Sequence, residues 1–224
     1  MLKVKNLTLS YRQSKTKVPD YVLRDLSFVI PENSITTITG ESGVGKTTLA
    51  KTLVGQLPET ARIHDAHFYI RGIKRGYHEL VAGERLDLFY APQNAKAALN
   101  PVLKLKAQFS DFYGRISSEL LNLLESFSFD SPERILNTYP FELSEGECKR
   151  LVIAIGLLLK PALYILDEPM ISVDITSQYI IASNLINFMQ QSNRAMVIIS
   201  HNYQFLHMLK EAAPDIPFHS IKLP

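Results

Sequence analysis

A stretch of eight residues near the start of the chain has the types and spacing of a phosphate-binding loop. It reads G-x-x-x-x-G-K-T between an apolar run at 34–39 and a helix-like stretch at 48–54. Glycines let the backbone curl so that several N–H groups face one phosphate chain, and the helix start adds partial positive charge. Lys46 is expected to reach the β- and γ-phosphates, and the Thr47 hydroxyl to hold Mg²⁺. A glycine turn that only caps a strand explains the complete pattern poorly. The predicted nucleotide contacts are Gly40, Glu41, Ser42, Gly43, Val44, Gly45, Lys46, Thr47 and Thr48.

Two further polar groups follow apolar runs that are typical of buried strands. Asp167 and Glu168 come directly after the run at 163–166, and His201 follows the run at 197–200. In a parallel sheet these positions lie at the edge where ligands bind. Beside a phosphate loop, Asp167 is expected to hold the Mg²⁺ shell, and Glu168 to orient or deprotonate a water that attacks the γ-phosphate. A simple polar turn, and a structural role for His201, are the alternatives.

The elements that must position these groups alternate between strands and helices. Apolar runs at 163–166 and 195–199 predict strands with a helix over 180–190 between them, which is typical of a parallel α/β sheet. Residues 1–35 and 63–73 predict further β elements, and 86–90 a short strand. A helix is expected over 119–125 and another after the N-cap Ser131. The capping-box pattern Ser144–Glu147 opens a helix that runs through Leu159.

Composition is ordinary for a globular protein, with 46% hydrophobic and 21% charged residues. A net charge of +2 is too balanced to predict a nucleic-acid partner. The single cysteine, Cys148, excludes an intrachain disulfide and favours a reducing compartment. Residues 1–6 do not have the pattern of a signal peptide, and the longest apolar run, 151–159, is far shorter than a membrane span.

The order of these motifs resembles that of the nucleotide-binding subunit of an ATP-binding cassette (ABC) transporter, over about residues 2–205. The phosphate loop matches Walker A, and 163–168 matches Walker B with its catalytic glutamate. Gln93 matches the glutamine that touches Mg²⁺ or water, and His201 the switch histidine. Residues 143–147 resemble the LSGGQ signature, with Ser144 and Gly146 as contacts to the ATP of a second subunit. Asp174 matches the D-loop, and Tyr11 the aromatic that stacks on adenine, or else a half-buried strand residue.

This resemblance implies a P-loop NTPase (RecA-like) fold and two ligands, ATP and Mg²⁺. A mostly parallel core would carry an N-terminal antiparallel β subdomain and a helical subdomain inserted at about 94–155. Residues 1–224 would then form one ABC-type ATPase domain.

A narrower resemblance, to the peptide/nickel importer group, lies in residues 93–101 and in Tyr139-Pro140. It implies a second ATP-binding subunit, two transmembrane permeases and, indirectly, an extracytoplasmic solute-binding protein. The chain would then lie at the cytoplasmic face of the cell membrane and energise uptake of a peptide, nickel or a metal chelate.

Two features depart from the family pattern. Glu145 replaces the first glycine of the signature and Glu147 its usual Gln or Met. We expect the Glu145 side chain to point away from the nucleotide, this signature to complete a weak ATP site, and the partner to be a different chain. Members of the importer group also usually continue into a longer C-terminal tail, whereas this sequence ends at Pro224.

Two other functions remain open on the sequence. One is a soluble ABC-type ATPase of DNA repair or translation, although such chains usually carry long coiled-coil insertions or two tandem cassettes. The other is a regulatory nucleotide-binding subunit with little turnover.

Overall fold

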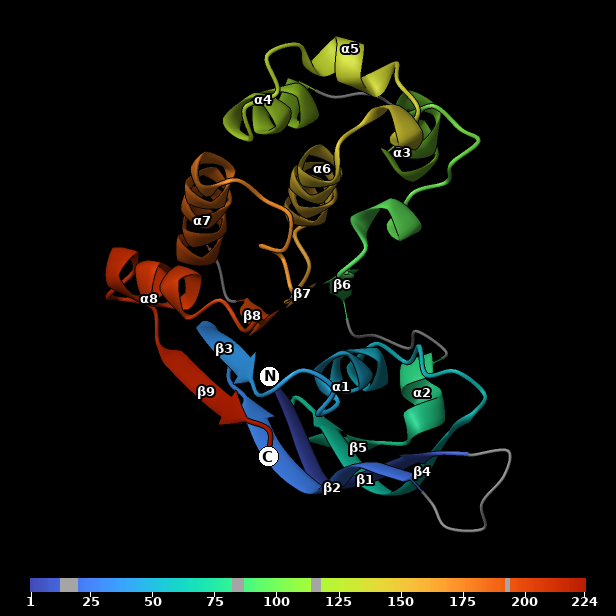
Figure 1. The fold of residues 1–224 in the computed structure, drawn as a ribbon. Coiled ribbons are helices and arrows are strands. Elements are labelled where there is room, and N and C mark those ends of the chain that lie inside the picture. Colours follow the sequence, from blue (N-terminus) through green and yellow to red (C-terminus); the bar gives the residue numbers. More distant parts are fainter. Residues whose placement is uncertain (13–19, 82–86, 114–117, 192–193) are drawn as a thin grey trace.

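The computed structural model describes residues 1–12, 20–81, 87–113, 118–191 and 194–224 (Figure 1). It contains two sheets with helices around them, as expected for an α/β chain. Residues 13–19, within the region 1–35 expected to hold β elements, and the start of the strand predicted at 86–90 lie outside the described residues.

The central sheet is entirely parallel, with the strand order β6-β7-β8-β3-β9. Successive side chains of a strand point to opposite faces, and in β7 both faces are buried. Leu163 and Ile165 join the core cluster that contains α1, whereas Tyr164 and Leu166 join the cluster that contains α6 and α7. A strand buried on both faces explains why these runs are continuously apolar. The strands are β3 (Ser34–Thr39), β6 (Leu88–Ala91), β7 (Leu163–Asp167), β8 (Ala195–Ile199) and β9 (Phe218–Lys222).

A second, antiparallel sheet has the order β2-β1-β4-β5 and is built from the N-terminal third of the chain. Leu49 and Leu53 of α1 (Lys46–Leu53) belong to the same core cluster as residues of both sheets. The predicted strand at 63–73 is in fact two strands, since Arg71 and Gly72 have φ of 47° and 82° and turn the chain. The strands are β1 (Leu2–Tyr11), β2 (Asp20–Ile30), β4 (Ala61–Ile70) and β5 (Ile73–Arg75), and α2 (Tyr77–Val81) follows them.

The segment between β6 and β7 is helical and lies at the end of the molecule opposite the antiparallel sheet (Figure 1). Its elements share a core cluster with one face of the parallel sheet. Ser131 is the N-cap of α5 as predicted, although its side chain makes no capping hydrogen bond there. The elements are η1 (Ala95–Ala98), α3 (Leu105–Tyr113), α4 (Ser118–Ser126), α5 (Pro132–Leu136), η2 (Pro140–Glu142) and α6 (Glu145–Leu158).

The C-terminal region contains elements that the sequence analysis did not identify. Helix α7 (Ile175–Gln190) begins five residues before its predicted start, and α8 (Tyr203–Ala212) and β9 follow β8. β9 completes the parallel sheet beside β3, and Ile35 N–H donates to the Pro217 carbonyl at 3.0 Å. The prolines at 214 and 217 both precede the strand, so they remove none of its ladder hydrogen bonds.

Helix α6 packs closely on the sheet at Gly156. A Cβ added there would lie 2.5 Å from ring atoms of both Phe89 and Tyr164. The two rings are themselves in contact, with centroids 5.3 Å apart, so neither can move freely.

We therefore expect Gly156→Ala to destabilise the protein, because overpacking of about 1–3 kcal/mol exceeds the gain in helix propensity of about 1 kcal/mol. Urea unfolding measures the change. Combining Gly156→Ala with Phe89→Leu should recover part of the lost stability, since the smaller side chain at position 89 makes room for the added methyl group. A strictly additive double variant would show that the ring contact is not the cause.

Candidate functional site

The carboxyl ends of four parallel strands meet at one edge of the central sheet. Asp167 of β7 pairs in register with Ile199 of β8, which pairs with Ile38 of β3, and Ala91 of β6 pairs with Leu166. Because the strand ends are level, the residues that follow them are brought together. These are Gly40 after β3, Gln93 after β6, Glu168 after β7 and His201 after β8. This is the edge at which ligands bind in open α/β sheets.

A cleft of about 560 Å³ opens at this edge. Most of the predicted nucleotide contacts line it, together with the predicted catalytic groups Gln93, Glu168 and His201. Ile171 and Tyr203, which the sequence analysis did not single out, also line it. The residues of the phosphate loop in the lining are Gly40, Glu41, Ser42, Gly43, Gly45, Lys46, Thr47 and Thr48.

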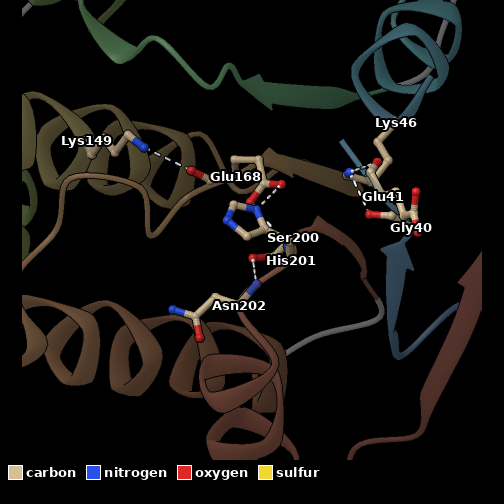
Figure 2. A network of polar contacts seen from close by, with 8 residues as sticks. All are labelled: Gly40, Glu41, Lys46, Lys149, Glu168, Ser200, His201 and Asn202. Atoms are coloured by element: carbon tan, nitrogen blue, oxygen red, sulfur yellow. Dashed lines mark hydrogen bonds and ion pairs between the residues drawn. The ribbon is translucent and has the colours of Figure 1, made fainter. Parts of the chain in front are cut away.

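The phosphate loop needs glycine at Gly45. Its φ is 99°, and a Cβ there would lie 2.6 Å from Cγ1 of Val22 in β2. Gly45 is also the N-cap of α1, so the helix begins directly at the loop. Lys46 is buried, and its ammonium donates to the carbonyls of Gly40 (2.9 Å) and Glu41 (2.8 Å). A full positive charge is therefore held against the loop that faces the cleft (Figure 2).

Asp167 lies beneath the cleft and is 1% exposed. The Tyr90 hydroxyl donates to its Oδ2 at 3.1 Å. Burial raises the pKa of Asp167, and the hydroxyls of Thr47 and Tyr90 act in the opposite direction. Its other oxygen, Oδ1, is buried and has no hydrogen-bond partner within the described chain. A buried carboxylate oxygen without a partner, next to a threonine hydroxyl, is suited to bind Mg²⁺, which prefers oxygen ligands. Water molecules and substrate phosphates would supply the remaining ligands of the ion.

Glu168 and His201 are in direct contact across β7 and β8. Nδ1 of His201 lies 2.8 Å from Glu168 Oε1, and the His201 N–H donates to Oε2 at 3.4 Å (Figure 2). An ionised carboxylate only accepts hydrogen bonds, so Nδ1 carries the hydrogen and Nε2 is left for another partner. The histidine is exposed while the carboxylate is buried. The contact therefore places a carboxylate and an imidazole on the cleft wall that faces the phosphate loop.

The link after β8 keeps His201 in place. The Asn202 N–H donates to Ser200 Oγ at 3.1 Å, and the Asn202 side chain caps α8 by accepting from the Phe205 N–H at 3.0 Å. Because the link between β8 and the capped helix is short, the backbone at His201 has little freedom to move.

The signature residues do not line this cleft. Ser144 is the N-cap of α6 and forms the predicted capping box with Glu147. Ser144 donates from both N–H (2.8 Å) and hydroxyl (2.7 Å) to Glu147 Oε2, and these contacts lower the pKa of that carboxyl. Glu145 is exposed and lines a separate cavity of about 280 Å³ beside the cleft. Gly146 lies against the Ser172 carbonyl, which would be 3.5 Å from an added Cβ.

Three other predicted nucleotide contacts, Tyr11, Val44 and Asp174, also lie outside the cleft lining. The Tyr11 hydroxyl is 3.1 Å from Thr48 Oγ1, so its ring stands at the end of β1 beside the phosphate loop. Val44 lies within that loop. The Asp174 carboxylate caps α7, accepting from the Ser177 N–H at 2.9 Å.

Two residues near the site were missed from the sequence. The Tyr90 hydroxyl supports Asp167. Burial raises the pKa of Tyr90, and the nearby Asp167 carboxylate raises it further. Lys149 is buried in α6 and donates to the Glu168 main-chain carbonyl at 2.9 Å (Figure 2). Burial lowers the pKa of Lys149, while the negative charges of Glu145, Glu168 and Asp167 act against this. The sequence provides little signal for this role, because Lys149 stands beside Arg150 in the polar first turns of α6.

Among the described residues, no helix combines the length and apolar character needed to cross a membrane.

Comparison with known proteins points to one family. The family described as ABC transporter matches residues 23–171. The chain is 30% identical over 219 residues to the dipeptide transport ATP-binding protein DppD of Caldanaerobacter subterraneus subsp. tengcongensis, a match covering 90% of this chain and 65% of DppD. It is 26% identical over 223 residues to the metal-staphylopine import system ATP-binding protein CntD of Staphylococcus aureus (strain Mu50), covering 94% of this chain and 80% of CntD.

The fold is similar to that of a dimeric ATP-binding cassette, MJ0796, solved in a post-hydrolysis state with ADP and phosphate. The TM-score is 0.76 at 23% sequence identity, over 92% of this chain and 90% of that one. Since the family match covers more than half of the sequence, this chain belongs to the ABC transporter family.

Proposed function

We propose that this chain is the ATP-hydrolysing subunit of an ABC importer that takes up a peptide, nickel or a metal chelate. The observation that carries the proposal is the meeting of Glu168, His201 and the phosphate loop in one cleft. The importer assignment rests on the names of DppD and CntD and on residues 93–101. Nothing in the structure favours a soluble ATPase of DNA repair or translation.

In this proposal, the phosphate loop and Lys46 bind the β- and γ-phosphates, and Tyr11 stacks on the adenine. Thr47, Asp167 and Gln93 hold Mg²⁺, which when bound would neutralise phosphate charge. Glu168 accepts a proton from, or orients, the attacking water, because it is a buried carboxylate with one face on the cleft. His201 is held by Glu168 and contacts the γ-phosphate through Nε2. Each of these chain groups acts by position and charge, which is what phosphoryl transfer requires.

A second ATP-binding subunit would complete each site. Ser144, Gly146 and Asp174 lie outside the cleft of this chain, so their expected contact with ATP requires a partner's nucleotide. We propose a head-to-tail dimer in which the signature of each subunit covers the cleft of the other.

The partner is proposed to be a different chain. The hydroxyl and N–H of Ser144 are both taken up by the Glu147 carboxylate, and Glu145 adds a second negative charge at the same helix start. At 4 Å from a γ-phosphate a carboxylate would be repelled by about 4 kcal/mol per unit-charge pair at an effective dielectric of 20, so the Glu145 side chain is expected to turn outward, and the loss of glycine still restricts the backbone of the signature. The site that this signature completes would therefore bind ATP weakly and turn over slowly, whereas the cleft of this chain keeps its catalytic groups.

The helical subdomain, residues 94–155, is proposed to contact one of two permeases. Val102, Leu103 and Phe141 are exposed there, which is unusual for large apolar side chains that gather on one segment. The Phe141 ring also stacks on Tyr139 at 5.5 Å between centroids. The assembly would place the chain at the cytoplasmic face of the cell membrane, with a solute-binding protein on the other side.

The role of Glu168 is tested by Glu168→Gln. We expect ATP to bind as before while hydrolysis falls by at least about 100-fold, because the amide cannot accept a proton. ATP binding and phosphate release are measured on the assembled complex, with the exposed Glu211→Gln as a control for the same chemical change. Near-normal turnover of Glu168→Gln would remove Glu168 from the mechanism.

The permease contact is tested by cysteine cross-linking from Val102→Cys. The native Cys148 does not interfere, because it is buried and its pKa is raised to about 11, so it stays a thiol at neutral pH. We expect a product with a transmembrane subunit from position 102, which is 76% exposed. Ile73→Cys, on the antiparallel sheet at the far end of the molecule, should give none (Figure 1). Equal yields from both positions, or none from Val102→Cys, would contradict the contact.

The weak signature is tested by Glu145→Gly. Removing the carboxylate and restoring backbone freedom should raise ATP-driven dimerisation or turnover of the complex. Sedimentation with and without ATP, together with phosphate release, measures both. A fall in both quantities would assign Glu145 a positive role at the interface.

A further inference from the structure

Lys149 is a buried cation whose hydrogen bond goes to the main chain of the proposed catalytic residue. It is 5% exposed, and its Nζ donates to the Glu168 carbonyl at 2.9 Å. Within the part of the chain that the structure describes, no carboxylate oxygen lies within 4.0 Å of Nζ. Burying an ammonium without an ion pair is unfavourable, and an apolar residue of the same size would pack without that penalty. The presence of a buried lysine at position 149 is therefore explained by its hydrogen bond to the Glu168 carbonyl.

The residue that it holds has a strained backbone. Glu168 has φ of 48°, in the left-handed region that non-glycine residues rarely occupy. Its N–H donates to the Ile199 carbonyl of β8 at 2.8 Å, and its carbonyl accepts from Lys149. The Glu168 carbonyl also accepts from the Ile171 N–H at 3.4 Å, so Lys149 of α6 anchors this peptide group together with the turn that follows, while the sheet anchors the peptide group before the Cα. Together they fix the direction of the carboxylate, which then contacts His201 (Figure 2).

The location of Lys149 connects two parts of the molecule. It is on α6, the helix whose N-cap is Ser144, and it lines the 280 Å³ cavity together with Glu145. That cavity adjoins the phosphate cleft, because Gln93 and Ile171 line both. A shift of the start of α6 relative to the central sheet would move Nζ, and with it the carbonyl that it holds.

We propose that Lys149 is a positioning residue, which holds the Glu168 backbone in its left-handed conformation and links the orientation of α6 to the aim of the catalytic carboxylate. The inference rests on the role proposed above for Glu168. Lys149 itself does not line the phosphate cleft.

The test compares Lys149→Met, which keeps the length and removes the donor, with Lys149→Gln, which keeps an N–H donor without the charge. In the assembly in which the wild-type chain hydrolyses ATP, we expect Lys149→Met to lower kcat by about 10- to 100-fold, the effect of a small misplacement of a reacting group. KM for ATP should stay within about two-fold, since no ATP contact is lost. Lys149→Gln should retain more of the wild-type kcat than Lys149→Met does.

A double-mutant cycle separates positioning of Glu168 from a general structural effect. In a Glu168→Gln background, neither Lys149 variant should slow the single-turnover rate further, because the group being positioned is already missing. Running the cycle with both variants keeps the test valid if one does not fold, as judged by thermal unfolding. Lys160→Met is the matched control: Lys160 follows the other end of α6 and pairs with Glu119 at the surface, so kcat should not change.

Wild-type kcat in both Lys149 variants would overturn the inference, as would a loss of the same size in the Glu168→Gln background. A parallel rise in KM would also overturn it, since Lys149 would then act on ATP binding. If Glu168→Gln alone keeps normal turnover, the proposed role of Glu168 fails instead, and the two failures are distinguished.

Discussion

The hydrogen-bonded register of β3, β7 and β8 is the constraint on which the site depends. Ile38, Ile199 and Asp167 are level in the ladder, so the chain leaves all three strands at one height. A slip of two residues in one strand would keep its faces buried but would move its terminal polar group by about 7 Å, out of reach of the others. The apolar core on both faces of the sheet therefore fixes not only stability but also the distance between phosphate loop, carboxylates and histidine.

Adjacent carboxylates at the end of β7 have different surroundings. Asp167 is enclosed, supported by Tyr90, and keeps one oxygen without a hydrogen-bond partner within the described chain. Glu168 turns in the opposite direction, into the cleft, because of its left-handed backbone. The alternating direction of side chains along a strand begins this separation, and the strain at Glu168 completes it. The two acids can thus have different roles, one towards a metal ion and one towards a water.

Helix α6 carries several features that are unusual in this chain. Its start holds the acidic signature, its second turn holds the buried Lys149, and its last turns pack on Phe89 and Tyr164 through Gly156. The acidic residues Glu145 and Glu147 stabilise the helix start through the macrodipole and the capping box. In the proposed dimer the same charges would weaken the contact with a phosphate of the second subunit, so a local gain in helix stability would accompany weaker ATP binding at one composite site.

The sequence by itself determined the phosphate loop, the parallel α/β core, the capping box of α6 and the residues at the strand ends. Local patterns suffice for these, since a complete motif or an apolar run specifies its own conformation. It also indicated the helical segment after Gln93, although the bounds of several elements moved by a few residues. Helix α8 and strand β9 were not predicted from the sequence, and only pairing with β3 makes 218–222 a strand.

Only the tertiary structure decided which groups support the site from a distance in the sequence. Tyr90 meets Asp167 across 77 residues, Lys149 meets Glu168 across 19, and Glu168 meets His201 across 33. Nothing in the local sequence specifies such contacts, because each depends on strand order, on register and on the packing of α6 against the sheet. The residues proposed to carry out the chemistry could be identified from the sequence. The residues that position them could be identified only from the folded structure, in which the sheet brings both sets together.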